Sequence, residues 1–149
     1  MGETFTDIKD GREPCLFAQN NYNTYGVLYN WLAASTACPD GWHLPSDAEW
    51  EQLVTYLDDD AGGKLKEKGT AHWKSPNTGA TNETGFTALP GGYLHSSLFY
   101  HIGYDGLWWS STEDRKNYAW YRYLDYDERD VYRVDAYKRF GLSIRCVKD

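Results

Sequence analysis

The segment Trp120-Tyr121-Arg122-Tyr123-Leu124-Asp125 alternates between two kinds of side chain. Trp, Arg and Leu occupy one set of alternate positions, and Tyr and Asp occupy the other. Alternate side chains of a β-strand point to opposite faces. The pattern therefore predicts a strand with one face packed inward and the other showing tyrosines and an aspartate to water.

The same two sets continue through the region from Gly103 to Cys146. The set expected to pack inward is Trp108, Trp109, Trp120, Arg122, Leu124, Val131, Arg133, Gly141, Ile144 and Arg145. The other set is rich in Tyr, Asp, Ser, His and Arg, which is the composition of an antibody paratope. An ordinary solvent face is the plainer interpretation, because Tyr also suits strands, but such faces usually carry Lys, Glu and Thr. We predict a ligand-binding surface formed by His95, Ser96, Ser97, Tyr100, His101, Tyr104, Asp105, Asp114, Arg115, Tyr118, Tyr121, Tyr123, Asp125, Asp127, Tyr132, Asp135, Tyr137 and Phe140.

Length and charge limit the class of protein. A chain of 149 residues is expected to form one domain. Its net charge of -7 argues against a general nucleic-acid surface and against attraction to anionic membranes. The first residues, Met-Gly-Glu-Thr-Phe-Thr-Asp, contain neither a basic nor an apolar region of a signal peptide. The protein is either not exported through a cleaved signal or begins after one.

Local patterns predict an α+β fold, with two helices packed on short, twisted antiparallel strands and long ordered loops. Apolar spacing indicates a helix or a helical turn over 24–34. Ser46 and Glu49 form a capping box before a second helix, which the aspartates and glycines of 58–63 should end. We expect an edge strand and loop over 1–22, helices and a long loop over 23–92, and a strand-rich variable region over 93–149. The long loop is 69–92, and strands are expected near 108–111, 119–124, 130–134 and 142–147.

The three cysteines, Cys15, Cys38 and Cys146, fit no zinc-binding spacing. Two states are open: Cys38 and Cys146 could close a loop of about 100 residues, or all three could be reduced and partly buried. The four histidines form no metal-binding motif, so no metal or other cofactor is expected. The inward arginines, Arg122, Arg133 and Arg145, are interpreted as structural, stacking on rings or pairing with carboxylates.

Several longer motifs resemble a known family, the Fibrobacter succinogenes major paralogous domain, whose fold is that of C-type lectins. The resemblance covers roughly residues 22–149. The motifs are Tyr25-Gly26-Val27-Leu28-Tyr29-Asn30-Trp31, the run from Cys38-Pro39-Asp40-Gly41-Trp42 to Trp50, Ala61-Gly62-Gly63-Lys64-Leu65-Lys66, Gly85-Phe86-Thr87-Ala88-Leu89-Pro90-Gly91-Gly92-Tyr93, Trp108-Trp109-Ser110-Ser111-Thr112 and Gly141-Leu142-Ser143-Ile144-Arg145-Cys146-Val147.

The resemblance implies a recognition module rather than an enzyme. Some members of the family resemble the variable proteins of diversity-generating retroelements, in which asparagine codons change to Tyr, Asp, His, Ser, Phe or Arg. The set from His95 to Phe140 is similar to those products, although Glu113 and Glu128 depart from the pattern. The sugar-type calcium motifs of C-type lectins are absent here, so the resemblance implies calcium-independent binding.

The expected ligand is a protein or a glycan. The module would be displayed on a cell surface, secreted, or carried on a phage particle. The sequence does not decide whether it forms an oligomer. Two alternatives remain. One is a structural or adhesion module whose tyrosines serve assembly. The other is an oxidase similar to the formylglycine-generating branch of the fold, for which Cys146 is the available cysteine near the C-terminus.

Overall fold

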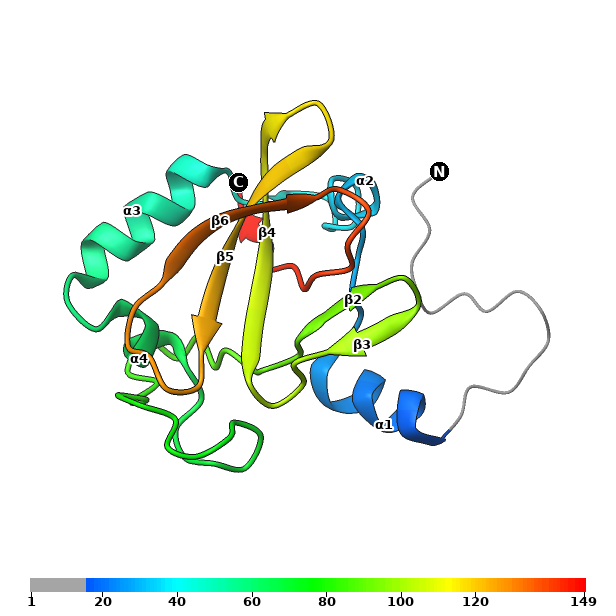
Figure 1. Ribbon diagram of the computed structural model, residues 1–149. Coiled ribbons are helices and arrows are strands. Elements are labelled where there is room, and N and C mark those ends of the chain that lie inside the picture. Colours follow the sequence, from blue (N-terminus) through cyan, green and yellow to red (C-terminus); the bar gives the residue numbers. More distant parts are fainter. Residues whose placement is uncertain (1–15) are drawn as a thin grey trace.

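The structure is a computed structural model of the chain and describes residues 16–149 (Figure 1). A three-stranded antiparallel sheet in the order β4-β5-β6 occupies the centre, flanked by two smaller sheets, β2-β3 and β1-β7. The strands are β1 (Trp42–His43), β2 (Tyr93–His95), β3 (Leu98–Tyr100), β4 (Asp105–Arg115), β5 (Tyr118–Asp125), β6 (Tyr132–Tyr137) and β7 (Val147–Lys148). The helices are α1 (Leu16–Tyr25), α2 (Trp31–Ala34), α3 (Asp47–Leu57) and α4 (Ala61–Leu65). The predicted α+β class is confirmed.

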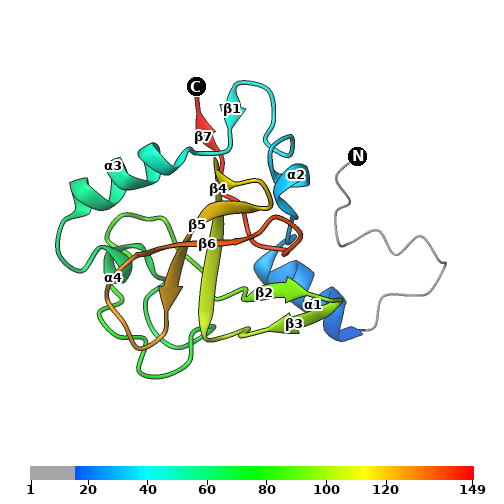
Figure 2. The same ribbon diagram turned by 45° about the horizontal axis from the view of Figure 1, so that its top comes forward.

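The three central strands overlap the predicted ranges 108–111, 119–124 and 130–134, but β4 is longer, at 105–115, and β6 begins later and ends later, at 132–137. The strand expected over 142–147 is wrong in its extent, because only 147–148 pairs as a strand, with β1 (Figure 2). Residues Leu142 and Ser143 make single bridges to Tyr29 and Trp108 instead. The β2-β3 hairpin has a two-residue turn, Ser96 and Ser97, with φ angles of 50° and 63°. Such turns usually carry Asn and Gly, so the sequence provides no strong signal for it.

The predicted helices are only partly right. Residues 16–22, expected as strand and loop, belong to helix α1, and the expectation for 1–15 lies outside the described residues. Of the helix or helical turn expected over 24–34, a continuous helix is not formed, because Tyr29 pairs through its backbone with Leu142 and is therefore extended. Only the single turn of α2 follows, started by Asn30, whose side chain accepts a hydrogen bond from the amide of Ala33. Leu32, expected on the apolar stripe, is 65% exposed.

The capping box predicted before α3 is present. The Ser46 hydroxyl accepts a hydrogen bond from the Glu49 amide at 3.2 Å, and a Glu49 carboxylate oxygen accepts one from the Ser46 amide at 2.8 Å. After Leu57 the chain does not simply end in a loop, because residues 61–65 form α4. Gly62 is needed there for close approach, since a Cβ atom at this position would overlap the backbone of Asp130.

Replacing Ser46 with alanine should lower the free energy of unfolding by about 1 kcal/mol, because the Glu49 amide loses its acceptor at the start of α3. Urea denaturation followed by circular dichroism measures the change. Ser35→Ala is the matched control, since that hydroxyl is exposed and only donates to the Leu32 carbonyl. A loss at Ser46 no larger than that at Ser35 would show that the cap adds nothing to stability.

Both faces of the central sheet are packed. On one face, Trp108 and Leu124 join a core with Trp50 and Leu57 of α3. On the other, Trp109 joins a second core, whose buried members are Ala34, Leu44, Leu107, Trp109, Ala119, Ala136 and Leu142. The prediction that one face shows its tyrosines to water is therefore wrong along part of β5.

Tyr121 and Tyr123 lie at the border of this second core. The ring of Tyr121 meets Trp109 edge to face at a centroid distance of 6.1 Å, and burial raises the pKa of its hydroxyl to about 12. Period two predicts which side chains share a face, but α2 and the segment around Leu142 decide how much of that face is covered.

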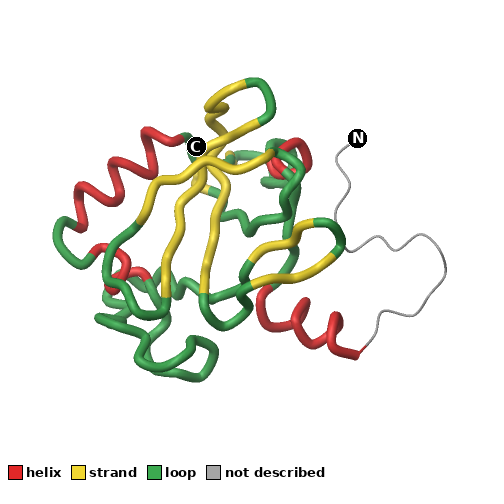
Figure 3. The backbone as a smooth tube through the Cα atoms, in the orientation of Figure 1, coloured by secondary structure: helices red, strands yellow, loops and turns green. Residues whose placement is uncertain are grey.

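The long loop predicted over 69–92 is present and extends over 66–92, at the end of the sheet where β5 finishes (Figure 3). It begins at the bridge between Lys66 and Ala88 and reaches β4 through a bridge between Gly92 and Gly106. Trp73 anchors its interior, with the indole N–H donating to the Ala88 carbonyl at 2.9 Å.

Candidate functional site

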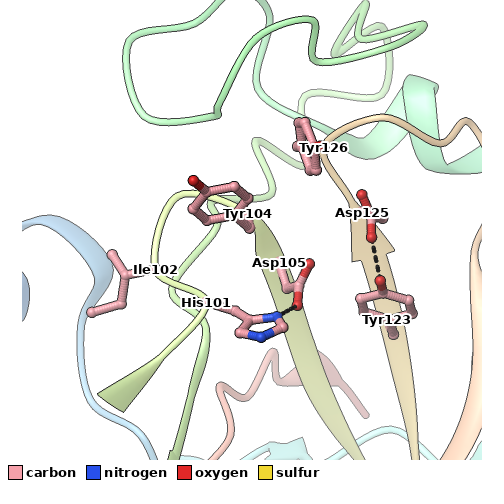
Figure 4. Close-up of a pocket in the computed structure, with 7 residues that line it drawn as sticks. All are labelled: His101, Ile102, Tyr104, Asp105, Tyr123, Asp125 and Tyr126. Atoms are coloured by element: carbon pink, nitrogen blue, oxygen red, sulfur yellow. Dashed lines mark hydrogen bonds and ion pairs between the residues drawn. The ribbon is translucent and has the colours of Figure 1, made fainter.

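A surface pocket of about 400 Å³ opens where β4 begins and β5 ends (Figure 4). Its walls come from the β3-β4 connection, from both strand ends and from the residue that follows β5. The lining residues are His101, Ile102, Tyr104, Asp105, Tyr123, Asp125 and Tyr126. Five of these seven belong to the predicted binding set.

Two backbone features hold the walls of this pocket in place. Gly92 has a φ of +64°, and a Cβ atom there would overlap the Tyr100 carbonyl, so glycine allows the chain that enters β2 to lie close to the end of β3. Its amide donates to the Asp105 carbonyl at 2.8 Å. On the other side, the buried Lys66 ammonium donates to the carbonyls of Asp125 and Glu128 at 2.9 and 2.7 Å. Lys66 thereby positions the loop that follows β5.

Asp105 is the most buried acid of the pocket, with a side chain 9% exposed. Its Oδ2 atom pairs with Nδ1 of His101, four residues earlier. Burial raises the pKa of the Asp105 carboxyl above its usual value, the contact with His101 opposes this effect, and the charge of Asp125 adds to it. Burial and the charge of Asp125 therefore both disfavour the charged form of the Asp105 carboxyl.

Asp125 is held by two donors. Its Oδ2 accepts the Tyr123 hydroxyl, and its Oδ1 accepts the Asp127 amide at 3.0 Å. Burial by itself would raise the pKa of Asp125, but these hydrogen bonds keep it below its ordinary value. Burial and the adjacent carboxylate raise the pKa of the Tyr123 hydroxyl. Near neutral pH, Asp125 is therefore charged and Tyr123 is a neutral donor.

A row of aromatic rings leads away from the pocket. His101 contacts Tyr93 at a centroid distance of 5.6 Å, and Tyr93 stacks on Tyr100 at 5.2 Å and on Phe140 at 5.9 Å. The row continues from Phe140 to Tyr137 at 6.1 Å and from Tyr137 to Tyr118 at 4.2 Å. We call Tyr93, Tyr100, Phe140, Tyr137 and Tyr118 the aromatic row.

A charged cluster ends the row at the β4-β5 hairpin. The Arg115 guanidinium lies 3.7 Å from the centroid of the Tyr118 ring. It pairs with Asp114 and also with Asp135 of β6, at 3.1 Å. The pocket, the aromatic row and this cluster together form one continuous surface, which we call the recognition surface.

The structure places most of the predicted binding residues on the recognition surface. His95 contacts Phe140 at 4.4 Å, and Tyr132 lies 5.6 Å from Tyr123, so both border it. Ser96 and Ser97 form the exposed hairpin turn beside His95. Tyr121 is partly buried at the border of the second core, and it belongs neither to the lining of the pocket nor to the aromatic row.

Tyr93 and Tyr126 belong to the site but were not predicted. Tyr93 ends the motif Gly85–Tyr93 that resembles the family, and it precedes the predicted binding set, which begins at His95. Tyr126 follows Trp120, Arg122 and Leu124 in the set of alternate positions that is expected to face inward. The chain leaves β5 at Asp125, and the ring of Tyr126 then meets Tyr104 edge to face at 5.3 Å. A pattern of period two carries no information beyond the strand end.

The ring and carboxylate contacts expected of the three arginines are present, but the prediction that all three pack inward is wrong: only Arg122 is buried, and the side chains of Arg133 and Arg145 are exposed. Arg122 pairs with Asp47 of α3 at 2.6 Å, and Arg133 stacks on Trp120 at 3.4 Å. Arg145 stacks on Phe86 at 4.3 Å. Among residues 16–149, no group of three or more His, Cys, Asp or Glu side chains could hold a metal ion. The same part of the chain contains no helix long and apolar enough to cross a membrane.

The fold and the site define an α+β domain with a continuous aromatic and charged surface over its central sheet and the β2-β3 hairpin. Residues 4–148 match the model of the Fibrobacter succinogenes major domain, and the chain belongs to this family. No curated protein and no solved structure matches the chain.

Proposed function

We propose that this domain is a ligand-binding module that recognises a protein or a glycan through the recognition surface. The observation that carries the proposal is the continuity of that surface. Rings and charged groups from β2, β3, β4, β5 and β6 form one path from the pocket to the β4-β5 hairpin. Tyrosines supply contact area at low entropic cost, as they do in antibody paratopes.

The second support is the exposure of tyrosines at the edges of this surface. Tyr104 and Tyr137 are each 41% exposed, and Tyr132 is 36% exposed. An ordinary interface buries about 800 Å² per partner, and a few such rings near its centre usually carry most of the binding energy. The packed cores behind the sheet make the surface rigid, which reduces the entropic cost of binding.

We further propose that the architecture is that of a C-type lectin and that the recognition surface is the diversified part of a retroelement variable protein. Its predicted residues come from one continuous segment, 95–140, while the apolar cores also draw on α2, α3 and α4. Diversification of that segment could therefore change the surface and leave much of the core constant. Near the gene, this proposal requires a reverse transcriptase and a near-copy of the coding segment that differs only at adenines.

The proposed location is a cell surface, the extracellular medium or a phage particle. The bond between Cys38 and Cys146 supports it, because disulfides persist in oxidising environments. The proposed recognition is independent of calcium. Ligand binding should therefore be unchanged when a chelator such as EDTA is added.

Replacing Tyr104, Tyr132 and Tyr137 together with alanine should weaken ligand binding at least tenfold, because these rings are exposed on the recognition surface. Ligands would be selected on the wild-type domain from a peptide display library and a glycan array. Their dissociation constants would then be measured by biolayer interferometry. Stability should change by less than about 1 kcal/mol, as is typical of exposed sites.

The matched control replaces three large exposed side chains elsewhere with alanine, namely Leu32, Trp42 and Tyr56, which are 65%, 45% and 86% exposed. Binding by this control should stay within twofold of wild type. If the ligands bind the tyrosine variant as tightly as wild type but bind the control variant more weakly, recognition lies on another face of the domain. Self-association that disappears in the tyrosine variant would favour the structural or adhesion module instead.

A further inference from the structure

The pocket brings two carboxylates together across a pair of strands. Asp105 of β4 and Asp125 of β5 are directly opposite each other in the antiparallel register. Like charges in this position destabilise a sheet. The cost is raised here because the Asp105 side chain is 9% exposed and so largely removed from water.

The described chain compensates these two charges unequally: Asp125 accepts hydrogen bonds from the Tyr123 hydroxyl and the Asp127 amide, whereas Asp105 has only the His101 ring. Within residues 16–149, neither carboxylate forms an ion pair with a lysine or an arginine, and Asp105 meets only His101. Other acids of the surface are paired: Asp135 with Arg115, for example, at 3.1 Å. The nearby Lys66 ammonium donates its hydrogen bonds to backbone carbonyls, and its charge still helps to lower the pKa of Asp125. Oδ1 of Asp105 accepts no hydrogen bond from the described part of the chain.

Tyrosine rings stand next to the two acids. In Figure 4, the ring of Tyr104 lies above Asp105 and the ring of Tyr126 lies above Asp125. The two rings meet edge to face at 5.3 Å, which leaves ring faces for other contacts. The Lys74 ammonium already lies 5.6 Å from the centroid of Tyr104. This ring therefore accepts a cation on one face, as aromatic faces commonly do.

We propose that the pocket binds an arginine side chain presented by a partner protein. The inference rests on the proposed function and names the chemistry of its ligand. A guanidinium can pair with carboxylates through two parallel hydrogen bonds while its plane stacks on a tyrosine. A volume of about 400 Å³ can hold such a side chain. The net charge of -7 would also attract a basic partner before contact.

The probe that tests this inference is Nα-acetyl-arginine N-methylamide, added to the ¹⁵N-labelled domain and followed by NMR. We expect saturable shifts at Tyr104, Asp105 and Tyr126, with a Kd of about 1–10 mM, as suits a fragment that makes few contacts. The citrulline analogue has nearly the same shape without the charge. It should bind at least tenfold more weakly.

Asp125→Asn should weaken binding of the arginine probe at least fivefold, because one charge is removed from the pair. Asp40→Asn is the matched control: it removes the same charge from an exposed turn before β1 and should leave binding unchanged. Tyr104→Leu provides a second variant at an exposed position, in case Asp125→Asn disturbs the loop. It should weaken binding at least threefold.

Equal binding of the citrulline analogue, or of a neutral methyl glycoside, would overturn the inference. So would arginine binding that is unchanged in both pocket variants. These results are distinct from failure of the proposed function. If selected ligands still depend on Tyr104, Tyr132 and Tyr137 while the arginine probe does not bind, the recognition surface stands and only the basic ligand is wrong.

Discussion

Arg122→Met should lower the free energy of unfolding by about 3 kcal/mol or more, as is typical when one partner of a buried ion pair is removed. The Arg122 side chain is 2% exposed and donates to Oδ1 of Asp47 at 2.6 Å and to the Asp47 carbonyl at 3.1 Å. Methionine fills similar space but cannot donate. Asp47, 18% exposed, would then keep only Arg133 as an ionic partner.

Chemical denaturation measures this loss, and a double-mutant cycle with Asp47→Asn isolates the pairwise part of it. The matched control is Arg129→Met. Arg129 pairs with Asp60 at 3.4 Å, but both side chains are about half exposed, so this change should cost less than 1 kcal/mol. Equal effects of the two substitutions would show that burial of Arg122 does not strengthen its contacts.

The position of Arg122 links the stability of the domain to ligand binding. It lies on β5 between Tyr121 and Tyr123, and it ties that strand to α3 through Asp47. The opposite face of the same strand carries the pocket residue Tyr123. We therefore expect ligand binding to weaken in Arg122→Met only under conditions where the domain begins to unfold.

Replacing Cys38 and Cys146 together with alanine should lower the free energy of unfolding by about 3–5 kcal/mol. The bond joins residues 108 apart in the sequence. The chain-entropy model assigns about 4.7 kcal/mol to a loop of roughly that length. The bond also ties the segment before β1 to the segment before β7, the two strands that pair at the C-terminus of the chain (Figure 2).

Urea denaturation with and without a reductant tests this prediction. Reduced wild-type protein should become as unstable as the double variant, and the variant should not respond to the reductant. Ligand binding below the unfolding transition should stay the same, because neither cysteine lines the pocket. If the free energy of unfolding of the wild-type protein is the same with and without the reductant, the disulfide does not constrain the unfolded chain.

The amount of the site that the sequence could predict depends on the range of the interactions. The alternation in β5 correctly grouped Arg122 and Leu124 on one face and Tyr121 and Tyr123 on the other. It could not show that Tyr121 would be covered, because the covering residues come from α2 and from near Leu142. The second core exists only after distant segments have packed.

The pocket shows the same division. Asp105 and Asp125 both belong to the predicted binding set, but they lie 20 residues apart in the sequence. Only the antiparallel register of β4 and β5 places them opposite each other. Phe140 likewise joins β2 to β6 within the aromatic row, a contact that no local pattern predicts.

The sequence by itself determined the features that depend on neighbours in the chain: the capping box at Ser46, the strands of the central sheet, the long loop and the acidic net charge. Only the tertiary structure decided that both faces of the sheet are packed, that no continuous helix forms over 24–34, and that two aspartates meet in one pocket. The physical reason is that backbone periodicity sets the direction of each side chain. The segments that come to lie against a side chain are set by long-range packing and strand register.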